Sequence, residues 1–346
     1  MSAKTILQSL VELRVSDIII IVIMKKTLML FAAVLTLLTG CTSNGKTSFR
    51  QGEFNQMEFT AEDGTQVKYN LYIPNDYKKE SEYPLVIFIH DAGALSDSTA
   101  AVLSQNGAKV WAEDEMQAKH PCFVLAPQFS GISIGDTSEP TPDVKATVAL
   151  IGQLCHDFNI DQDRIYGTGQ SMGCMQTIVT AINYPDLYAA MYLVAGQWEA
   201  EDCAPLVGKK IWIVVSEDDQ RAYPGMNAIT DYLVTKGASL FREPMNAQAT
   251  TGEWEEYARK AIDSDANIKF TPLLSGTLPE WNPSFKPGNG GGFDRGHKPG
   301  SNGNKPMGGR PGEKPLGPGA AAAHMGTFPV AYTFTPILDW LFEQTK

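Results

Sequence analysis

The segment Tyr166–Thr177, YGTGQSMGCMQT, places three glycines around Ser171. Glycines at this density are typical of a backbone that must pass where no side chain fits. Two kinds of structure require such a backbone. One is a turn that binds phosphate at the N-terminus of a helix. The other is a sharp turn between a strand and a helix that exposes a serine as a nucleophile.

The phosphate-binding interpretation fits the segment poorly. Its glycines are spaced G-x-G-x-x-x-G, one residue longer than the dinucleotide-binding fingerprint. That fingerprint normally opens the first strand–helix unit of a domain and is followed by an acidic residue at the end of the next strand. Here several expected strands come first, and the next one ends with VAGQ at 194–197. We therefore expect no nucleotide cofactor.

The exposed-serine interpretation fits better. Residues 169–173, GQSMG, have the form G-x-S-x-G between an expected strand and an expected helix. The turn is so sharp that the residues two before and two after the serine must lack side chains. The pattern predicts that Ser171 is a nucleophile, and a passive serine in a glycine-rich turn is the alternative. Gly167 lies outside the motif, where we expect it only to permit close packing.

A nucleophilic serine needs a histidine base and an acid, and after such a turn the chain order is serine, acid, histidine. The histidines that follow Ser171 are His297 and His324. His297 lies in a glycine-rich segment that would not hold the ring still. His324 precedes a C-terminal amphipathic segment, and we expect it to be the base, on a loop braced by a docked helix. His297 as the base, or a surface role for His324, are the alternatives.

The acid is expected on the turn after a late buried strand. The strand 209–216, KKIWIVVS, is followed by Glu217, Asp218 and Asp219. A carboxylate there can accept the second N–H of the histidine and stabilise the imidazolium. Three adjacent acids cannot all point inward, and their order alone does not choose among them.

The rest of the chain alternates between apolar strands and amphipathic helices. This alternation predicts one α/β domain over 54–346, with a mostly parallel sheet covered by helices on both faces. An N-terminal hairpin across Asp63-Gly64 is expected to be antiparallel. The expected strands are 54–60, 66–73, 84–90, 122–127, 163–169, 188–196, 209–216 and 267–274, and the expected helices are 98–118, 144–158, 174–185, 224–236, 252–262 and 335–344.

Residues 284–323 interrupt this pattern. They contain twelve glycines and six prolines, with six basic and two acidic residues. Such a composition buries too little apolar area to order itself, so we expect a disordered insertion. A basic segment in a chain of net charge −11 could contact an anionic polymer or phospholipid headgroups. The other interpretation is a solvated tether with no partner. The net charge itself argues against general nucleic-acid binding.

The N-terminal residues have the features of a secretion signal. Met24-Lys25-Lys26 precedes an apolar run over 28–38, which is short for a membrane span. The following Leu38-Thr39-Gly40-Cys41 resembles the lipobox of bacterial lipoproteins. The resemblance implies a signal peptide over 24–40, a lipid on Cys41, a tether over 41–53 and a membrane-anchored protein of the bacterial cell envelope. In that case translation starts at Met24, and residues 1–23 come from a start codon assigned too far upstream. An ordinary signal peptide or anchor helix with an incidental cysteine is the alternative.

The remaining cysteines are Cys122, Cys155, Cys174 and Cys203. The cell envelope permits disulfides, and four cysteines allow three pairings, among which the residues do not choose. All four can equally be small buried side chains. A bond between Cys174 and Cys203 is one pairing to examine. No cysteine–histidine cluster suggests a metal site.

Four stretches together resemble the α/β-hydrolase superfamily. They are VIFIHDAGA (86–94), IDQDRIYGTGQSMGCM (160–175), VSEDDQRAYP (215–224) and HMGTF with LDWLF (324–328 and 338–342). Within the superfamily the chain is similar to secreted bacterial serine esterases, the prolyl-oligopeptidase-like group that includes polyhydroxybutyrate depolymerases and feruloyl and acetylxylan esterases. The resemblance covers about 54–345 apart from the insertion. It implies the α/β-hydrolase fold, and its spacing before a proline favours Asp219 as the acid.

One motif departs from that group. After the strand 84–90 the group usually has His-Gly-x-Gly, whereas this chain has His90-Asp91-Ala92-Gly93. We expect the backbone N–H groups of Ala92 and Met172 to hold the oxyanion. Asp91 must then point away from it, or this donor pair is wrong. His90 is expected to be structural.

These residues predict a serine hydrolase that cleaves carboxylic esters, with acyl groups on polysaccharides among the possible substrates. A peptidase with the same residues is one alternative, although peptidases on this fold generally carry a large extra domain. A glycan-binding lipoprotein on an inactive hydrolase fold is another. Trp198 follows a strand near the expected site, where it can stack on a substrate or belong to the core.

Overall fold

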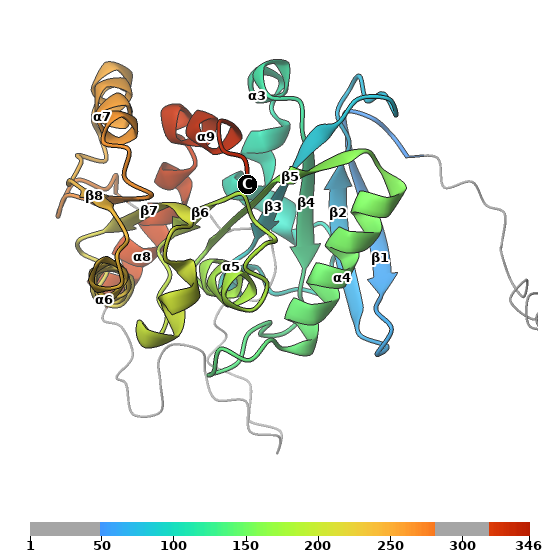
Figure 1. Cartoon of the computed structure of the whole chain (residues 1–346), viewed down its shortest axis with the longest axis horizontal. Helices are drawn as coiled ribbons and strands as arrows, with labels where there is room; N and C mark the ends of the chain where they lie inside the picture. The colour runs from blue at the N-terminus through green and yellow to red at the C-terminus, as the bar shows by residue number, and fades with distance from the viewer. Residues whose placement is uncertain (1–48, 281–317) are drawn as a thin grey trace, which may run out of the picture. The chain divides into compact units, whose positions relative to one another are not determined.

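A mixed sheet forms the centre of the described part of the chain, which is residues 49–280 and 318–346 of this computed structural model (Figure 1). The strand order is β1-β2-β4-β3-β5-β6-β7-β9-β8. The first hairpin is antiparallel, β2 pairs antiparallel with β4, and all other pairs are parallel. The strands are β1 (Phe54–Thr60), β2 (Gln66–Tyr72), β3 (Tyr83–Ile89), β4 (Phe123–Gln128), β5 (Ile160–Gln170), β6 (Ala190–Val194), β7 (Lys210–Ser216), β8 (Leu240–Arg242) and β9 (Ile268–Leu273).

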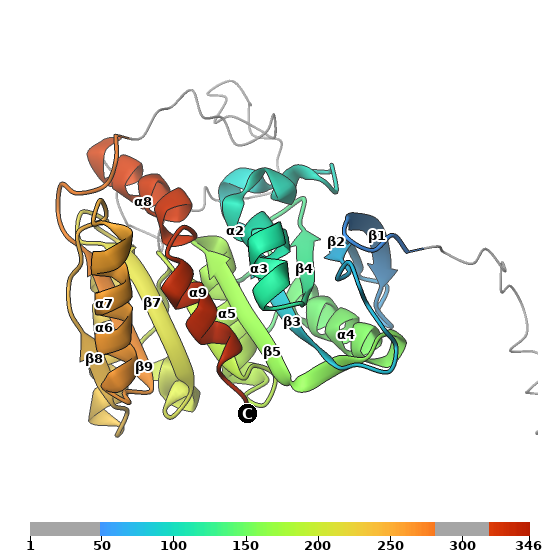
Figure 2. The same cartoon turned by 90° about the horizontal axis from the view of Figure 1, so that it is seen from above.

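Helices cover both faces of the sheet, so its parallel strands are apolar on both sides. Figure 1 shows α4, α5 and α6 on one face and α3, α7 and α9 on the other, and Figure 2 shows the second group in front. The helices are α2 (Asn106–Lys109), α3 (Asp114–Lys119), α4 (Pro142–Asp157), α5 (Met172–Asn183), α6 (Ala222–Thr235), α7 (Thr251–Asp263), α8 (Pro318–Ala331) and α9 (Thr335–Phe342). Short 3-10 turns are η1 (Ala92–Ala94), η2 (Ala101–Ser104), η3 (Val110–Ala112) and η4 (Glu201–Leu206).

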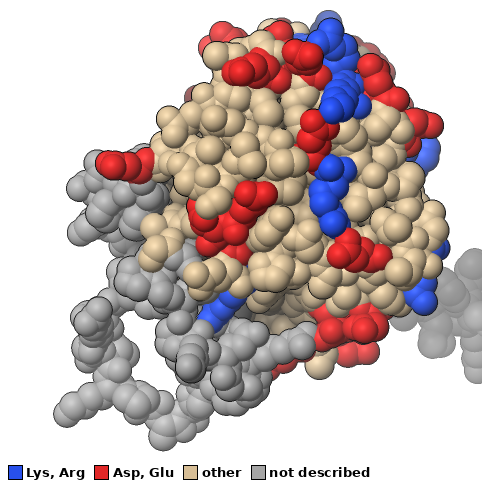
Figure 3. Space-filling model, turned by 90° about the vertical axis from the view of Figure 1, so that its left-hand side faces the viewer, with Lys and Arg blue, Asp and Glu red and all other residues tan. Residues whose placement is uncertain are grey.

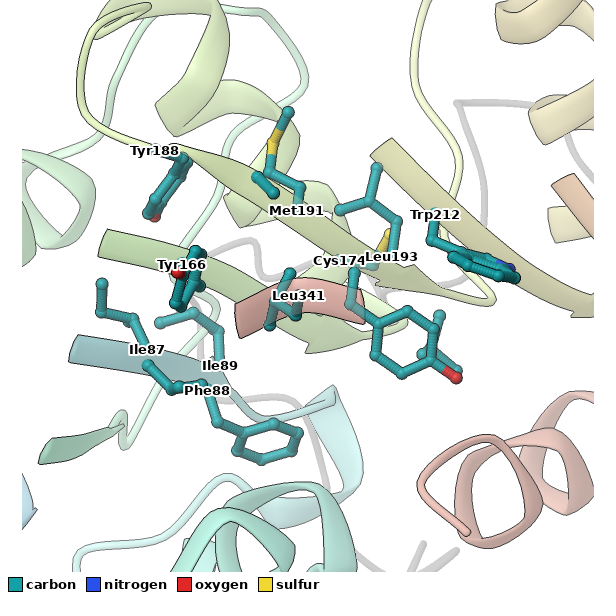
Figure 4. Packing of buried hydrophobic residues seen from close by; sticks show 14 of the residues in the cluster. Ile87, Phe88, Ile89, Tyr166, Cys174, Tyr188, Met191, Leu193, Trp212 and Leu341 are labelled. Carbon is teal, nitrogen blue, oxygen red and sulfur yellow. The ribbon is translucent and has the colours of Figure 1, made fainter. Parts of the chain in front are cut away.

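The C-terminal helix α9 is held by the core of the sheet. Leu341 of α9 is fully buried and lies among the side chains of the central strands (Figure 4). The indole of Trp340 meets that of Trp212 on β7 edge-to-face, with ring centroids 5.2 Å apart. Aromatic pairs of this kind add to the stabilisation from apolar burial. The predicted docked C-terminal helix is therefore confirmed.

The predicted helix over 98–118 is wrong as a single element. The chain instead forms η2, α2, η3 and α3 in succession. Gln105 and Glu113 have extended backbone, with ψ of 136° and 145°, and each separates two of these pieces. Within α2, Gly107 permits close packing, because a Cβ there would lie 2.2 Å from the ring of Phe88. Tertiary packing overrides the local helical pattern here.

A second correction concerns the segment before α9. Residues 318–331 form helix α8, so His324 lies on a helix and not on a loop. The alanine run 320–323 strongly favours a helix, and the predicted insertion boundary at 323 is therefore wrong. Residues 284–317 of that insertion lie outside the described residues. So do the signal segment and Cys41, within 1–48. The three-residue strand β8 was not predicted.

The face formed by α6, α7 and β8 carries charges of both signs. Figure 3 shows acidic and basic side chains interspersed on this face, without a large basic patch. Lys260 Nζ lies 2.5 Å from Glu243 Oε2, and Arg242 Nη2 lies 2.7 Å from Asp231 Oδ1. Exposed ion pairs of this kind contribute little to stability. Among the helices of 49–280 and 318–346, none combines the length and the hydrophobicity that a bilayer crossing needs.

Candidate active site

Ser171 occupies a strained turn between β5 and α5. Its backbone has φ of 52° and ψ of −116°, a combination that side-chain-bearing residues rarely adopt. The Ser171 N–H donates to Val194 O on the neighbouring strand at 3.0 Å, and Ser171 O accepts from Met175 N in the helix at 3.0 Å. These hydrogen bonds stabilise the strained backbone conformation of Ser171, and they place the serine between the end of β5 and the first turn of α5.

The glycines around Ser171 make this turn sterically possible. A Cβ on Gly173 would lie 1.9 Å from Ile89 O on β3. A Cβ on Gly169 would lie 2.5 Å from the carbonyl carbon of Gly173. The predicted need for residues without side chains on both sides of the serine is therefore confirmed. Gly167 has the predicted packing role, because a Cβ there would lie 2.8 Å from the ring of Tyr188.

The structure brings Ser171, His324 and Asp219 together from three separate elements. His324 Nε2 lies 2.9 Å from Ser171 Oγ, and His324 Nδ1 lies 2.5 Å from Asp219 Oδ2. With a hydrogen on Nδ1, the ring donates to the carboxylate and accepts the hydroxyl proton of the serine. The ring of Phe328, one turn further along α8, meets the imidazole edge-to-face at 5.0 Å. The imidazole is thus held from three sides.

Asp219 is the acid of the 217–219 turn that faces His324. Its side chain is fully buried. While Oδ2 faces the imidazole, Oδ1 accepts the N–H groups of Arg221 at 3.1 Å and Ala222 at 2.9 Å. These donors lie at the start of α6, where the helix dipole also favours a negative charge. The carboxylate is therefore held in a fixed orientation toward the imidazole.

Glu217 and Asp218 face the loop after β9 instead. Glu217 Oε2 accepts the N–H of Ser275 at 3.0 Å. Asp218 accepts the Ser275 hydroxyl at 2.5 Å and the Gly276 N–H at 2.8 Å. These hydrogen bonds, that from the Ser275 side chain first, lower the pKa of Asp218. The two acids thus attach a loop, and the geometry separates them from Asp219.

The two predicted oxyanion donors follow the ends of two adjacent strands. Met172 is the first residue of α5, and Ala92 is the first residue of η1 after β3. Register brings these ends together, because Ile89 of β3 pairs with Gly169 of β5. In 49–280 and 318–346, the backbone bonds formed outside the helices and strands do not use the Ala92 or Met172 N–H. Within the described residues, both groups can therefore donate to a ligand.

Asp91 has an inward-facing carboxylate and an ordinary extended backbone, with φ of −75° and ψ of 170°. No glycine is needed at this position in this chain. One carboxylate oxygen accepts the Gly93 N–H at 2.6 Å. The other accepts the amide groups of Gln170, at 2.7 Å, and Gln105. The two glutamines were not singled out from the sequence, where only the position of Gln170 beside Ser171 could have indicated them.

His90 is fully buried and has a structural arrangement, as expected. Its Nδ1 lies 2.7 Å from Asp91 O, to which it donates, and its Nε2 accepts the Phe129 N–H at 3.0 Å. Burial lowers the pKa of His90 and so favours the neutral ring. Both nitrogens are therefore occupied in tying the end of β3 to the residue that follows β4.

The four described cysteines are all free thiols, so the pairing of Cys174 with Cys203 is not formed. Cys174 packs instead against Gly196, where a Cβ would lie 2.4 Å from its sulfur. Burial raises the pKa of Cys203 to about 12, which keeps it protonated. Trp198 is half-buried and donates its indole N–H to Ser138 Oγ at 2.8 Å. In 49–280 and 318–346, no group of three or more metal-binding side chains is arranged to hold an ion.

A hollow of about 410 Å³ lies beside this constellation. One wall comes from the acid turn and the loop after β9, and the other from the first turns of α8 before His324. Its lining includes Asp218, Gln220, Gly276, Leu278, Pro279 and Ala322. The lining thus includes the chain neighbours of Asp219 and His324, and it does not include Ser171, His324 or Asp219 themselves.

No protein-family model matches the chain. Over 123 residues it is 27% identical to poly(3-hydroxyalkanoate) depolymerase C of Paucimonas lemoignei, covering 33% of this chain and 28% of the depolymerase. Over 264 residues it is 22% identical to acetylxylan esterase A of Emericella nidulans, covering 68% of this chain and 82% of that esterase.

Among solved structures, the crystal structure of a thermostable esterase superposes with a TM-score of 0.61 and 23% sequence identity. The match covers 85% of this chain and 64% of that esterase. The chain thus spans only part of the depolymerase and of the thermostable esterase that it matches. Together with the strand order, this superposition shows that the chain has the α/β-hydrolase fold, and in sequence it is similar to carboxylic ester hydrolases.

Proposed function

We propose that this protein is a serine esterase that hydrolyses carboxylic esters through Ser171, His324 and Asp219. The observation that carries the proposal is the single imidazole of His324, hydrogen-bonded to a strained, helix-capping serine at 2.9 Å and to a buried carboxylate at 2.5 Å. Serine, base and orienting acid in this geometry are the requirement for nucleophilic acyl transfer. The similarity to esterases supports the same reaction class.

The reaction proceeds in two halves. His324 Nε2 takes the hydroxyl proton as Ser171 Oγ bonds to the ester carbonyl carbon, and the carbonyl oxygen becomes an oxyanion. The Met172 and Ala92 N–H groups hold that oxyanion. The C–O bond to the alcohol then breaks, His324 returns the proton to the leaving alcohol, and an acyl-enzyme remains.

Water completes the cycle. His324 takes a proton from the water as its oxygen bonds to the acyl carbon, and the same two N–H groups hold the second oxyanion. The Ser171 Oγ–acyl bond breaks, Ser171 recovers its proton from His324, and the carboxylic acid leaves. Asp219 keeps the hydrogen of the neutral ring on Nδ1 and stabilises the imidazolium in both halves.

The proposed substrates are acyl groups carried by a polymer such as a polysaccharide. The relatives named for acetylxylan and for poly(3-hydroxyalkanoate) support this class. The hollow lined by Asp218 and Ala322 adjoins the turns that carry Asp219 and His324, and in this proposal it receives part of a large substrate. A panel of acetyl, feruloyl and longer acyl esters, each presented on a small alcohol and on xylan, tests the class. Equal rates on both carriers would argue against a polymer substrate.

The proposed location is the bacterial cell envelope, periplasmic or surface-exposed, with the protein anchored to a membrane through a lipid on Cys41. The supporting feature is the lipobox-like Leu38-Thr39-Gly40-Cys41 after a basic start and a short apolar run. In this proposal translation begins at Met24, residues 24–40 are removed, and 41–53 form a tether. Labelling with palmitate tests this location. The wild type should incorporate the label, whereas Cys41→Ser should not, and the activity of Cys41→Ser should leave the membrane fraction. Unlabelled wild-type protein would refute the lipid.

The decisive test of the reaction is Ser171→Ala assayed with a nitrophenyl ester. Removing the nucleophile should lower kcat by about 10⁶-fold. A fluorophosphonate probe should label Ser171 in the wild type and fail to label the variant. Full activity in Ser171→Ala would refute the esterase mechanism. Hydrolysis of peptides but not esters would indicate a peptidase, and retention of glycans without any hydrolysis would indicate a binding protein.

A further inference from the structure

The carboxylate of Asp91 joins three parts of the molecule that meet at the active site. It is 3% exposed, at the end of β3, and its two oxygens accept hydrogen bonds from Gly93 N, Gln105 Nε2 and Gln170 Nε2. Gly93 belongs to η1, the turn that carries the Ala92 N–H. Gln170 is the last residue of β5 and directly precedes Ser171. One side chain thus holds the turn of one oxyanion donor against the strand that presents the nucleophile.

Gln105 connects the same carboxylate to the helix that carries His324. Gln105 caps α2, whose Ala108 N–H donates to Gln105 O at 3.2 Å. Within α2, Asn106 donates to the backbone oxygen of Tyr332, directly after α8, at 3.3 Å. The Tyr332 ring packs against Gly107, where a Cβ would lie 2.7 Å from it. Movement of Gln105 would therefore reach the end of α8.

The surroundings of Asp91 are built for a carboxylate. Within the described residues its oxygens accept from three N–H donors and pair with no cation, so the group is bound by directed hydrogen bonds and not by a single counter-charge. A Cβ on Gly93 would lie 2.7 Å from Asp91 Oδ1, so the glycine makes room for this oxygen. The Oε1 of Gln105 is buried without a partner in the described residues. Its amide is thus oriented by Asp91 alone.

We infer that Asp91 is a positioning residue that fixes the Ala92 N–H relative to Ser171. This inference rests on the esterase mechanism proposed above. An oxyanion donor acts only when its N–H lies within hydrogen-bond distance of the position that the oxyanion will occupy. Asp91 sets that distance by holding η1 to Gln170, and it does so through hydrogen-bond geometry. Its charge is not required, because a negative charge near an oxyanion is unfavourable by itself.

This role makes a specific prediction for two substitutions at the same position. Asp91→Ala removes all three hydrogen bonds and leaves Gln105 and Gln170 without an acceptor. Asp91→Asn keeps the acceptor for Gly93 N, and its amide can donate to the Oε1 atoms of Gln105 and Gln170 once both of those side-chain amides rotate by half a turn. Asn should therefore restore the turn without the charge, whereas Ala should not.

The experiment measures kcat, KM and inhibition by a trifluoromethyl ketone, whose adduct with Ser171 carries an oxyanion. All rates are divided by the amount of Ser171 that a fluorophosphonate titrates, so that unfolded protein does not count. Asp91→Ala should lower kcat about 100-fold with KM within about threefold of the wild type, since a misplaced donor affects the transition state and not binding. Its affinity for the ketone should fall in parallel with kcat. Asp91→Asn should recover at least about a third of the loss in log kcat, so its kcat should be at least about fivefold higher than that of Asp91→Ala.

Gln105→Ala and Gln117→Ala provide a matched pair of controls. Both glutamines are 7% exposed, but Gln117 bonds to Trp111 O at 2.8 Å and to Cys122 O at 3.1 Å, without contact to Asp91. Both variants should lower Tm, and only Gln105→Ala should lower kcat and the ketone affinity. Wild-type kcat in Asp91→Ala, an equal kcat loss in Gln117→Ala, or no recovery in Asp91→Asn would each overturn the inference. If the wild type is inactive or Ser171→Ala is fully active, the esterase mechanism itself fails.

Discussion

His324 and Asp219 are 105 positions apart in the chain, yet His324 Nδ1 lies 2.5 Å from Asp219 Oδ2. The carboxylate is fully buried and its other oxygen accepts two backbone N–H groups at the start of α6. The imidazole is therefore oriented by an acid that cannot rotate away. This arrangement gives the proposed base a defined tautomer before any substrate binds.

Asp219→Asn should lower kcat about 10⁴-fold with little change in KM, because an amide can donate to the ring and so favour the wrong tautomer. Steady-state kinetics on a nitrophenyl ester measure the effect. Asp218→Asn is the matched control, since Asp218 is the neighbouring aspartate that bonds to Ser275 and Gly276. Its kcat should stay close to that of the wild type. Similar losses in the two variants would contradict the assignment of Asp219.

The turn at Ser171 should not tolerate a side chain at Gly173. Gly173→Ala places a Cβ 1.9 Å from Ile89 O, which is backbone and cannot rotate away. Moving the nucleophile by a fraction of an ångström should lower kcat by more than about 100-fold. Gly152→Ala is the control, because Gly152 lies inside α4 with nothing within 4 Å of its Cβ position. That variant should gain about 1 kcal/mol of stability at unchanged kcat. An active Gly173→Ala would show that the turn is looser than the structure indicates.

Stability should fall in mild acid because of His90. Burial holds the pKa of His90 below its ordinary value of 6.5 in the folded protein, so the unfolded chain takes up a proton that the folded chain does not. The stabilisation is fully present above pH 6.5 and is lost as the pH falls from there toward the folded-state pKa.

Thermal unfolding at pH 7.5 and pH 5.5 measures this loss as a decrease in Tm. His90→Asn has a lower Tm throughout, since Asn cannot reach both Asp91 O and Phe129 N. Between pH 7.5 and pH 5.5, the Tm of this variant should nevertheless decrease less than that of the wild type. The difference between the two decreases should be about 2–4 °C. Equal decreases in the two proteins would assign the acid sensitivity to other groups.

The hollow beside α8 should affect large substrates selectively. Ala322→Trp fills space on the wall opposite Leu278 and the loop after β9. KM should rise about tenfold for an acylated oligosaccharide and stay unchanged for nitrophenyl acetate, because the small ester does not reach that wall. An equal rise for both esters would indicate that the substitution disturbs His324 instead. Lys260→Trp is the control, because Lys260 lies on α7 and does not line this hollow.

Much of the architecture could be predicted from local patterns. The hairpin of β1 and β2, the apolar parallel strands and the long helices α4, α5, α6 and α7 match the expected segments, because each has a clear period and a clear boundary. The region 98–118 could not be predicted as a run of short pieces. Its pieces are separated at Gln105 and Glu113, and its contacts, such as those of Gly107 with Phe88 and Tyr332, come from other elements.

The amino-acid sequence by itself determined the turn at Ser171, since G-x-S-x-G between a strand and a helix leaves little steric freedom. It also determined the order in which an acid and His324 follow. The residues alone left Glu217, Asp218 and Asp219 open, and the family resemblance favoured Asp219. The tertiary structure shows that Asp219 faces the imidazole, because the three side chains differ in direction and little in chemistry. The same holds for Asp91, whose partners Gln105 and Gln170 come from separate elements. Hydrogen-bond partners between distant segments depend on the sheet order and register, which no local pattern contains.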